Sequence, residues 1–543
     1  MTRILALLAL FGFLAAPAPT RAADATATGP TFMLRLQSVN QFLDNGEYIA
    51  GLVGQEEMAK QLLGFARALG GEKKILEGVD MSKPFVVYAN LAPEITNSEF
   101  VAMFPIGDKD AFLGLLKGRL SLDVRDEKNG LYSVESPNNA GTIYFRFAND
   151  YVYGTYLNKD NIAVAKLPKP ADVIGKDIGV LSLSFRVDRL PDEMKKFALG
   201  TIETGLAKGK EEKIPNETPA IRNLSNQAID SLSAGMKAIL DDGEEVTLKI
   251  DIDPKKDELA LEIGMTAKKG SSLAKDMLGW KTRKSVAFGS LISKDNAVII
   301  AGNLTLPESI KKLLGPAIDD LVKLGLKEAP ADAIGVLEPL IKGVVPTLKA
   351  GDFDGGTALL GPNADNKYTG LTVGKVANGK ELEKSIKEAV AKLPAEYKSV
   401  FELDAETIDG VKYHKIKIKE HLDEKTTKVF GDNDLWLAFR DDAVFAAVGP
   451  QAKDAIKSAL NASPASGSLF KMEFSIARLI PLSEVQDEKA SKRAAKQVFG
   501  KDLTGDTFTL ALDGGDSLKL RASLKGKVIK FGYLMSEKNK EDK

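Results

Sequence analysis

Two stretches of the chain, residues 143–153 and 435–445, share one pattern of alternation. Each alternates apolar with small or polar residues on both sides of a two-residue turn, which is Asn149-Asp150 in the first and Asp441-Asp442 in the second. Alternation with a period of two is typical of a β-hairpin that packs one face against a core. The sequence therefore predicts two similar hairpins far apart in one chain.

Further resemblances between the two parts of the chain occur in the same order along it. Strands follow one another through short turns, while helical patterns stand between groups of strands. We therefore predict an α+β fold of two tandem, related halves, each a largely antiparallel sheet covered by helices. The matching pairs are 100–116 with 368–390, 130–133 with 410–413, 181–191 with 470–481, and 246–265 with 508–524.

The two halves differ in their helices, because the pattern at 485–499 is shorter and more polar than those at 191–206 and 219–240. A further apolar stripe at three-to-four spacing, from Ile49 to Leu69, predicts a helix packed on a sheet.

The predicted organisation has five segments. They are 1–22, a signal peptide; 23–31, disordered; 32–283, the first half; 284–535, the second half; and 536–543, a charged tail expected to fray.

The N-terminus predicts export. Arg3 supplies positive charge, residues 4–16 form an apolar run, and Thr20-Arg21-Ala22 places small residues where a signal peptidase cleaves. The alternative is an uncleaved anchor, but the run is short for a transmembrane helix. We expect cleavage after Ala22, a periplasmic or secreted protein, and no membrane span after cleavage.

Composition excludes several classes of protein. The 543 residues contain 74 Lys plus Arg and 75 Asp plus Glu, a net charge of -1, which argues against a nucleic-acid partner. The chain has no Cys, which excludes disulfides, thiol catalysis and a lipid-modified N-terminal cysteine. The folded state must therefore depend on its apolar cores.

Short catalytic motifs are incomplete. Ser272-Leu273-Ala274-Lys275 and Ser309-Ile310-Lys311-Lys312 fit Ser-x-x-Lys, but no Lys-Thr-Gly follows, and Gly-x-Ser-x-Gly does not occur. Residues 370–375 have one residue too few between their glycines for a phosphate-binding loop and predict a strand-to-helix turn instead. We assign no catalytic and no cofactor-binding residue, and we expect no cofactor.

The two histidines, His414 and His421, are the candidate metal ligands, with Asp423 and Glu424 nearby. Alternation places His414 on the same face of a strand as Ile416 and Ile418, so we interpret it as structural and predict no metal site. Three acidic segments resemble the start of a calcium loop but lack its twelfth-position Glu, and we interpret them as turns. They are 352–356, 432–434 and 513–516.

The residues 36–43, 143–153 and 410–416 together resemble a group of exported bacterial proteins of unknown function that are built from duplicated α+β units. The resemblance covers most of the chain after the signal peptide, but its motifs are packing and turn patterns. It implies a role in the cell envelope and no catalytic residues.

Three functions remain. The first is an exported, non-enzymatic cell-envelope protein with a binding or scaffolding role, whose partner is an envelope component or an apolar ligand. The second is a periplasmic carrier that encloses an apolar ligand between sheet and helices, which a large apolar cavity would favour. The third is a carboxylate-based hydrolase, because two facing carboxylates are defined only by their separation in space. The sequence favours a protein that is not an enzyme.

Overall fold

The fold is described from a computed structural model, in which the chain divides into two compact units. The first unit comprises Met1–Thr201 and Ile239–Lys268, and the second comprises Ile202–Ala238 and Lys269–Lys543. The predicted signal peptide lies outside the described residues. The structure describes residues 29–57, 60–61, 64, 76–135, 141–211, 219–281, 283–306, 308–419, 422–483, 489–500 and 505–541.

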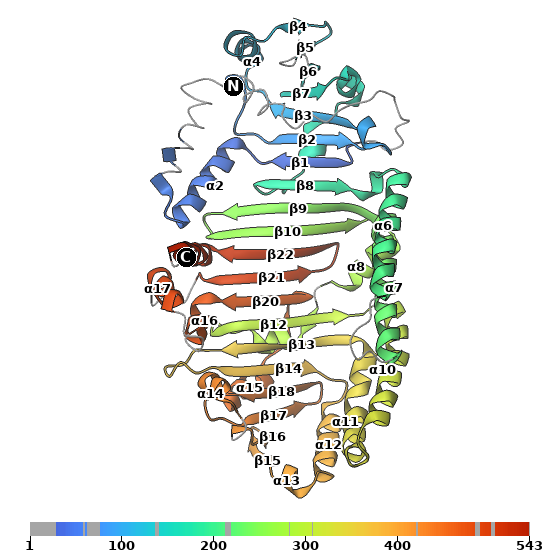
Figure 1. The fold of residues 1–543 in the computed structure, drawn as a ribbon, viewed down its shortest axis with the longest axis vertical. Coiled ribbons are helices and arrows are strands. Elements are labelled where there is room, and N and C mark those ends of the chain that lie inside the picture. Colours follow the sequence, from blue (N-terminus) through green and yellow to red (C-terminus); the bar gives the residue numbers. More distant parts are fainter. Residues whose placement is uncertain are drawn as a thin grey trace. The chain divides into compact units, whose positions relative to one another are not determined.

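The first unit contains a sheet of antiparallel strands (Figure 1). Its spatial order is β4-β5-β6-β7-β3-β2-β1-β8-β9-β10. Thr31, at the end of the segment predicted to be disordered, is buried, and its N–H donates to the carbonyl of Ala89 (2.8 Å). The strands are β1 Phe32–Leu36, β2 Phe85–Asn90, β3 Glu99–Pro105, β4 Val124–Asp126, β5 Leu131–Glu135, β6 Thr142–Ala148, β7 Tyr151–Tyr156, β8 Leu181–Arg186, β9 Gly243–Asp253 and β10 Glu258–Ala267.

The helix that begins the first unit differs from its prediction. It starts ten residues before Ile49, at Val39, because the Ser38 hydroxyl caps it by accepting from the Gln41 N–H (3.0 Å). It ends at Leu52, and most of the predicted continuation to Leu69 lies outside the described residues. The helices are α2 Val39–Leu52, η1 Ile95–Asn97, α4 Lys109–Gly114, η2 Leu115–Arg119, η4 Lys159–Ile162, η5 Val164–Lys166, α5 Pro170–Ile174 and η6 Val187–Arg189.

Both faces of this sheet carry a core. On one face, Phe112, Leu115 and Leu116 of α4 and η2 pack against Ile143 and Phe145, and the Asp108 side chain caps α4 by accepting from the Ala111 N–H. The opposite face holds a second core that includes Tyr88, Tyr153 and Val173. The sheet is thus covered on both sides at β3, β6 and β7.

The strands of the second unit are also antiparallel. Their spatial order is β15-β16-β17-β18-β14-β13-β12-β20-β21-β22. A separate short pair joins β11 (Lys284–Ser285) to β19 (Ala465–Ser466). The strands are β12 Asn296–Thr305, β13 Asp352–Leu360, β14 Thr369–Lys375, β15 Phe401–Ile408, β16 Val411–Ile416, β17 Leu435–Arg440, β18 Ala443–Val448, β20 Phe470–Ser475, β21 Thr507–Asp513 and β22 Ser517–Lys525.

Helices cover one face of the second sheet around β14, β17 and β18. α9 and α15 supply Phe288 and Ile456 to a core that also contains Phe445. The C-terminal helix runs to Glu541, past the start of the tail predicted to fray, and its Phe531 ring lies 5.4 Å from that of Phe499. The helices are α8 Ser272–Gly279, α9 Val286–Leu291, α10 Glu308–Glu328, α11 Ala331–Ala350, α12 Gly379–Ala391, α13 Ala395–Lys398, α14 Glu424–Phe430, α15 Ala452–Asn461, α16 Ile476–Ser483, α17 Lys489–Val498 and α18 Gly526–Glu541.

Between β8 and β9 the chain forms α6 (Asp192–Glu211) and α7 (Pro219–Asp242), close to the two helices that the sequence predicted there. The division into units falls within α6 and near the end of α7. Across the described residues, no helix combines the length and hydrophobicity that crossing a bilayer requires. The mixture of helices with antiparallel sheets confirms the predicted α+β class.

The two predicted hairpins are present. Ala148 pairs with Tyr151 across the first turn and Arg440 with Ala443 across the second, so each loop has two residues. In the second hairpin, Trp436 packs against the core under α15, and the Lys453 ammonium lies 4.9 Å from its ring centroid. Both faces of β17 are therefore in contact with other side chains.

Candidate functional site

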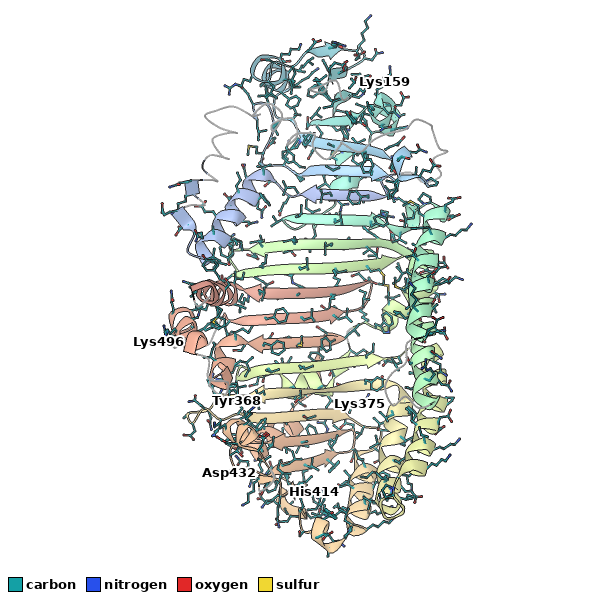
Figure 2. All side chains as sticks on the ribbon, in the orientation of Figure 1. Lys159, Tyr368, Lys375, His414, Asp432 and Lys496 are labelled. Carbon is teal, nitrogen blue, oxygen red and sulfur yellow. The ribbon has the colours of Figure 1, made fainter. Side chains whose placement is uncertain are left out.

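The structure brings His414 of β16, labelled in Figure 2, together with two carboxylates that the sequence did not associate with it. His414 is buried, with 3% of its surface exposed. Its Nδ1 accepts a hydrogen bond from the backbone N–H of Asp404 in β15 (3.0 Å). Its Nε2 lies 3.3 Å from Glu383 Oε1 of α12, without the alignment of a hydrogen bond. Glu383, Asp404 and His414 are a geometrically possible metal cluster.

The Lys387 ammonium bridges the two carboxylates of this cluster. Its Nζ lies 2.7 Å from Glu383 Oε1 and 2.8 Å from Asp404 Oδ1, and Lys412 approaches the other oxygen of Asp404 (3.3 Å). The His414 Nδ1 lone pair is taken by the Asp404 N–H, so the neutral ring carries its proton on Nε2. The carboxylates and the ring are therefore engaged by a lysine and a backbone amide rather than arranged around a free cation site.

Burial sets the charge of His414. Desolvation lowers the pKa of the imidazole below its ordinary value, and the nearby Lys387 acts in the same direction, while Glu383 and Asp404 oppose them in part. The pKa of the Asp404 carboxyl is also lowered, chiefly by its hydrogen bond with Lys387. His414 is thus a neutral, buried side chain in an ion network. His421 lies outside the described residues.

Two of the segments predicted to be turns are strands. Residues 352–356 belong to β13, where the buried carboxylate of Asp354 accepts from the N–H groups of Val286 (2.8 Å) and Ala287 (3.1 Å) at the start of α9. Residues 370–375 belong to β14, between β13 and β18, so both neighbouring strands pair with the backbone groups that a phosphate loop would need. The acidic and glycine-rich composition of these two segments suggested turns. The strands that pair with them are distant in sequence, so the pairing could not be predicted from local composition.

Asp506 engages α16 in the same way. Its carboxylate accepts from the Ser475 hydroxyl and the Ala477 N–H, both at 2.6 Å. The segment 513–516 connects β21 to β22, as expected of a turn. Buried Asp354 and Asp506 therefore stabilise helix N-termini.

A second candidate site, in the first unit, is an apolar surface of its sheet. On β1, β8, β9 and β10, the apolar side chains occupy one face and are half-buried or exposed. We call this the first apolar face. Its most open members are Leu248, Leu261 and Ile263, at 37%, 43% and 44% exposed. The strand registers place its residues in three rows that cross the strands: Leu36, Leu181, Ile250, Leu261; then Leu34, Leu183, Leu248, Ile263; then Phe32, Phe185, Val246, Met265.

The opposite face of the same strands also buries polar side chains, beside the apolar Met33 and Ala260. Arg35 donates to the carbonyl of Val173 in α5 and to the hydroxyl of Ser184, and Lys249 lies 2.8 Å from Asp177. Arg35, Ser182, Ser184 and Lys249 are all buried. β1, β8 and β9 therefore bury polar side chains on one side, while the apolar side chains of the other side are half-buried or, at Leu248, Leu261 and Ile263, exposed. An ordinary one-sided sheet buries its apolar side instead.

The second unit carries a corresponding surface on β12, β20, β21 and β22, which we call the second apolar face. Its members are again half-buried or exposed, with Leu520 at 37%. It is richer in aromatic residues, and the rings of Phe474 and Phe508 stack with centroids 6.2 Å apart. Its rows are Val298, Phe474, Phe508, Leu524; then Ile300, Met472, Leu510, Ala522; then Gly302, Phe470, Leu512, Leu520.

The sequence predicted these apolar faces in part. The alternation of Leu181, Leu183 and Phe185 predicted a strand with one apolar side, but the covered side depends on which helices pack there. Which helices pack on a strand is decided by the tertiary fold and cannot be predicted from alternation alone.

Comparison with protein-family models, with curated proteins and with solved structures finds no match.

Proposed function

We propose that this chain is an exported, non-enzymatic protein of the cell envelope that binds apolar ligands through its two apolar faces. The observation that carries the proposal is the reversed sheet of the first unit, where the apolar side is the open one. Soluble proteins rarely expose large contiguous apolar patches, and such patches mark sites of interaction. Export is supported by the N-terminal sequence pattern, which is that of a cleaved signal peptide.

We further propose that the two units arose by tandem duplication. Support comes from their sheets, because the sequence of strand positions is the same in both when β1 to β10 are matched with β12 to β18 and β20 to β22. The hairpins at 143–153 and 435–445 fall at the same position in each sheet. The apolar faces also fall on matched strands, so each unit would contribute one binding surface.

The open faces favour a surface that receives a ligand over a carrier that encloses one. A carboxylate-based hydrolase draws less support, because the buried carboxylates of Asp354 and Asp506 are engaged at helix N-termini, and those of Glu383 and Asp404 are engaged by Lys387. Binding rather than hydrolysis is therefore the function that these contacts support best.

Binding of anilinonaphthalene sulfonate, a dye that fluoresces on apolar surfaces, tests the proposal. The double variant Leu261→Ser/Ile263→Ser should bind less dye than the wild type at equal folded fraction. The matched control is Phe42→Ser/Ile95→Ser, which removes two apolar side chains of the first unit, 52% and 65% exposed, outside the face. Equal dye binding by the face variant and the wild type would contradict the proposal.

A further inference from the structure

The first apolar face is covered at one end and open at the other. Its rows continue past β1 onto β2, where Leu36 pairs with Phe85 and Leu34 with Val87. Phe85 and Val87 pack against the core under α4 and η2. On β9 and β10, by contrast, the face has its most open members, which are 37–44% exposed. Among the described residues, the open part of this surface therefore lies on β9 and β10.

The chain enters this surface at a fixed point. Pro30 and Thr31 are both buried. The Pro30 carbonyl accepts from Arg189 Nη1 (2.9 Å), and the Thr31 N–H donates to the carbonyl of Ala89 (2.8 Å). The next residue, Phe32, is the first member of the apolar face. The chain that precedes Pro30 is therefore tethered at the border of the face.

The chain that precedes this point carries an apolar segment. Residues 4–16 have no polar or charged side chain, and residues 17–29 connect them to Pro30. A flexible connection of that length has a root-mean-square span of about 20 Å. From Phe32, the spacings between strands and between rows place Leu248, Leu261 and Ile263 at about 12–20 Å. The connection therefore allows the apolar segment to reach the open part of the face.

Building on the proposed function, which includes export, we propose that residues 4–16 of the uncleaved signal peptide cover the first apolar face at β8, β9 and β10, and that cleavage opens the face to its ligands. Apolar surface is buried on both partners. The segment lies there as a helix, because a helix satisfies its own backbone groups and the apolar side chains of the face offer no hydrogen bonds. The tether sets an effective concentration of about millimolar, so contacts that are weak between separate molecules are sufficient.

Disulfide trapping in the full chain tests this placement, because the sequence has no Cys and each introduced pair is unique. Leu8→Cys and Leu10→Cys, which lie on opposite sides of a helix, are each combined with Ile263→Cys. The faster of the two pairs should close an intramolecular disulfide about tenfold faster than either does with Ile95→Cys, since only residues that approach closely can be bridged. Ile95 is the matched control, because it is 65% exposed, lies outside the face and follows Leu91, whose N–H donates to Thr31 Oγ1 (3.3 Å). Both targets are thus within reach of the tether.

Dye binding gives an independent measurement. At equal folded fraction by circular dichroism, the full chain should bind less anilinonaphthalene sulfonate than the chain that begins at Ala23. Leu7→Gln/Leu10→Gln in the full chain should restore part of the difference, because polar side chains are costly to bury. Light scattering of the same samples should show monomers.

Equal disulfide rates at Ile263 and Ile95, or at least as much dye on the full chain as on the chain from Ala23, would overturn this inference and leave the proposed function intact. Disulfides that join two chains would also overturn it, because a second copy would then cover the face. The proposed function fails separately, when Leu261→Ser/Ile263→Ser leaves dye binding unchanged in the chain from Ala23, where no signal peptide is present.

Discussion

The two units order their strands alike but fill the same positions with different chemistry. In the first unit, Val134 of β5 lies in an apolar core with Phe112 of α4. In the sequence match of 130–133 with 410–413, the residue that follows is Val134 in the first unit and His414 in the second, which is held by Asp404 and approached by Glu383 of α12. Alternation therefore determines the strands, whereas the contact between helix and sheet accommodates either packed apolar side chains or an ion network.

The units also place their long helices at different connections. In the first, the long pair α6 and α7 follows β8, while in the second the long pair α10 and α11 follows β12. The connection after β20 holds only the shorter α16 and α17. The long helices therefore differ in position between the two units, while the order of the strands is the same.

The largest expected effect concerns the two cores. Phe145 in the first unit and Phe445 in the second are each about fully buried, at 1% and 0% exposed. Phe145→Ala and Phe445→Ala should each lower the free energy of unfolding by about 3–5 kcal/mol, because each leaves a cavity in a packed core. Urea titration followed by circular dichroism measures this. Phe197→Ala, at an exposed site of α6, is the control and should change little.

A loss well below 1 kcal/mol for either core variant would show that its unit is not held together by the core described here. The two units would then differ, because only one of them would depend on a packed core on a face of its sheet.

An intermediate effect is expected from making the second unit resemble the first. His414→Val removes the acceptor of the part-buried Asp404 N–H and should cost about 0.5–1.5 kcal/mol, the net contribution of one hydrogen bond. Burial depresses the pKa of His414 in the fold, so the unfolded chain takes up the proton first on acidification. Wild-type stability should therefore be complete above about pH 6.5 and decline as the pH falls below it.

The variant should lack that part of the decline between about pH 6.5 and pH 5. Thermal melts of both proteins across this range measure it. Identical pH profiles would show that His414 does not carry a depressed pKa in the fold. A variant as stable as the wild type would show that the ion network adds nothing over hydrocarbon.

A smaller effect distinguishes the two hairpin turns. Asn149 and Asp150 have positive φ angles of 51° and 61°, whereas neither residue of the Asp441-Asp442 turn does. Asp150→Gly should stabilise the protein by less than about 1 kcal/mol, because glycine adopts this conformation without steric cost. Asp442→Gly should destabilise it slightly, since it also removes the contact with Arg440 (2.6 Å). Chemical denaturation of the two variants compares them, and equal shifts would contradict the assigned turn geometry.

The smallest expected effect is that of a chelator. Because Lys387 already lies between Glu383 and Asp404, dialysis against EDTA should leave the melting temperature unchanged. A clear decrease that added zinc or calcium restores would assign a metal to this protein.

The sequence predicted the hairpins, α6, α7, α12 and the α+β class because those depend on local periodicity. It did not predict α10 and α11, which contain Pro316, Pro339 and Pro346 in helical interiors, where proline ordinarily ends a helix. It also misassigned β13, since the acidity of Asp354 is explained only by the distant start of α9. The cluster of Glu383, Asp404 and His414 joins three separate elements, and no spacing rule connects them.

The central claim is that the two apolar faces receive apolar ligands. Photocrosslinking with a fatty acid that carries a diazirine on its chain, followed by peptide mass spectrometry, tests it most directly. The account predicts labels on the apolar faces, chiefly at Leu248, Leu261 and Ile263 and also near Leu520, with dodecanoate competing. Labels confined to Phe197 of α6 and Leu232 of α7, which are exposed apolar residues away from both faces, would contradict it.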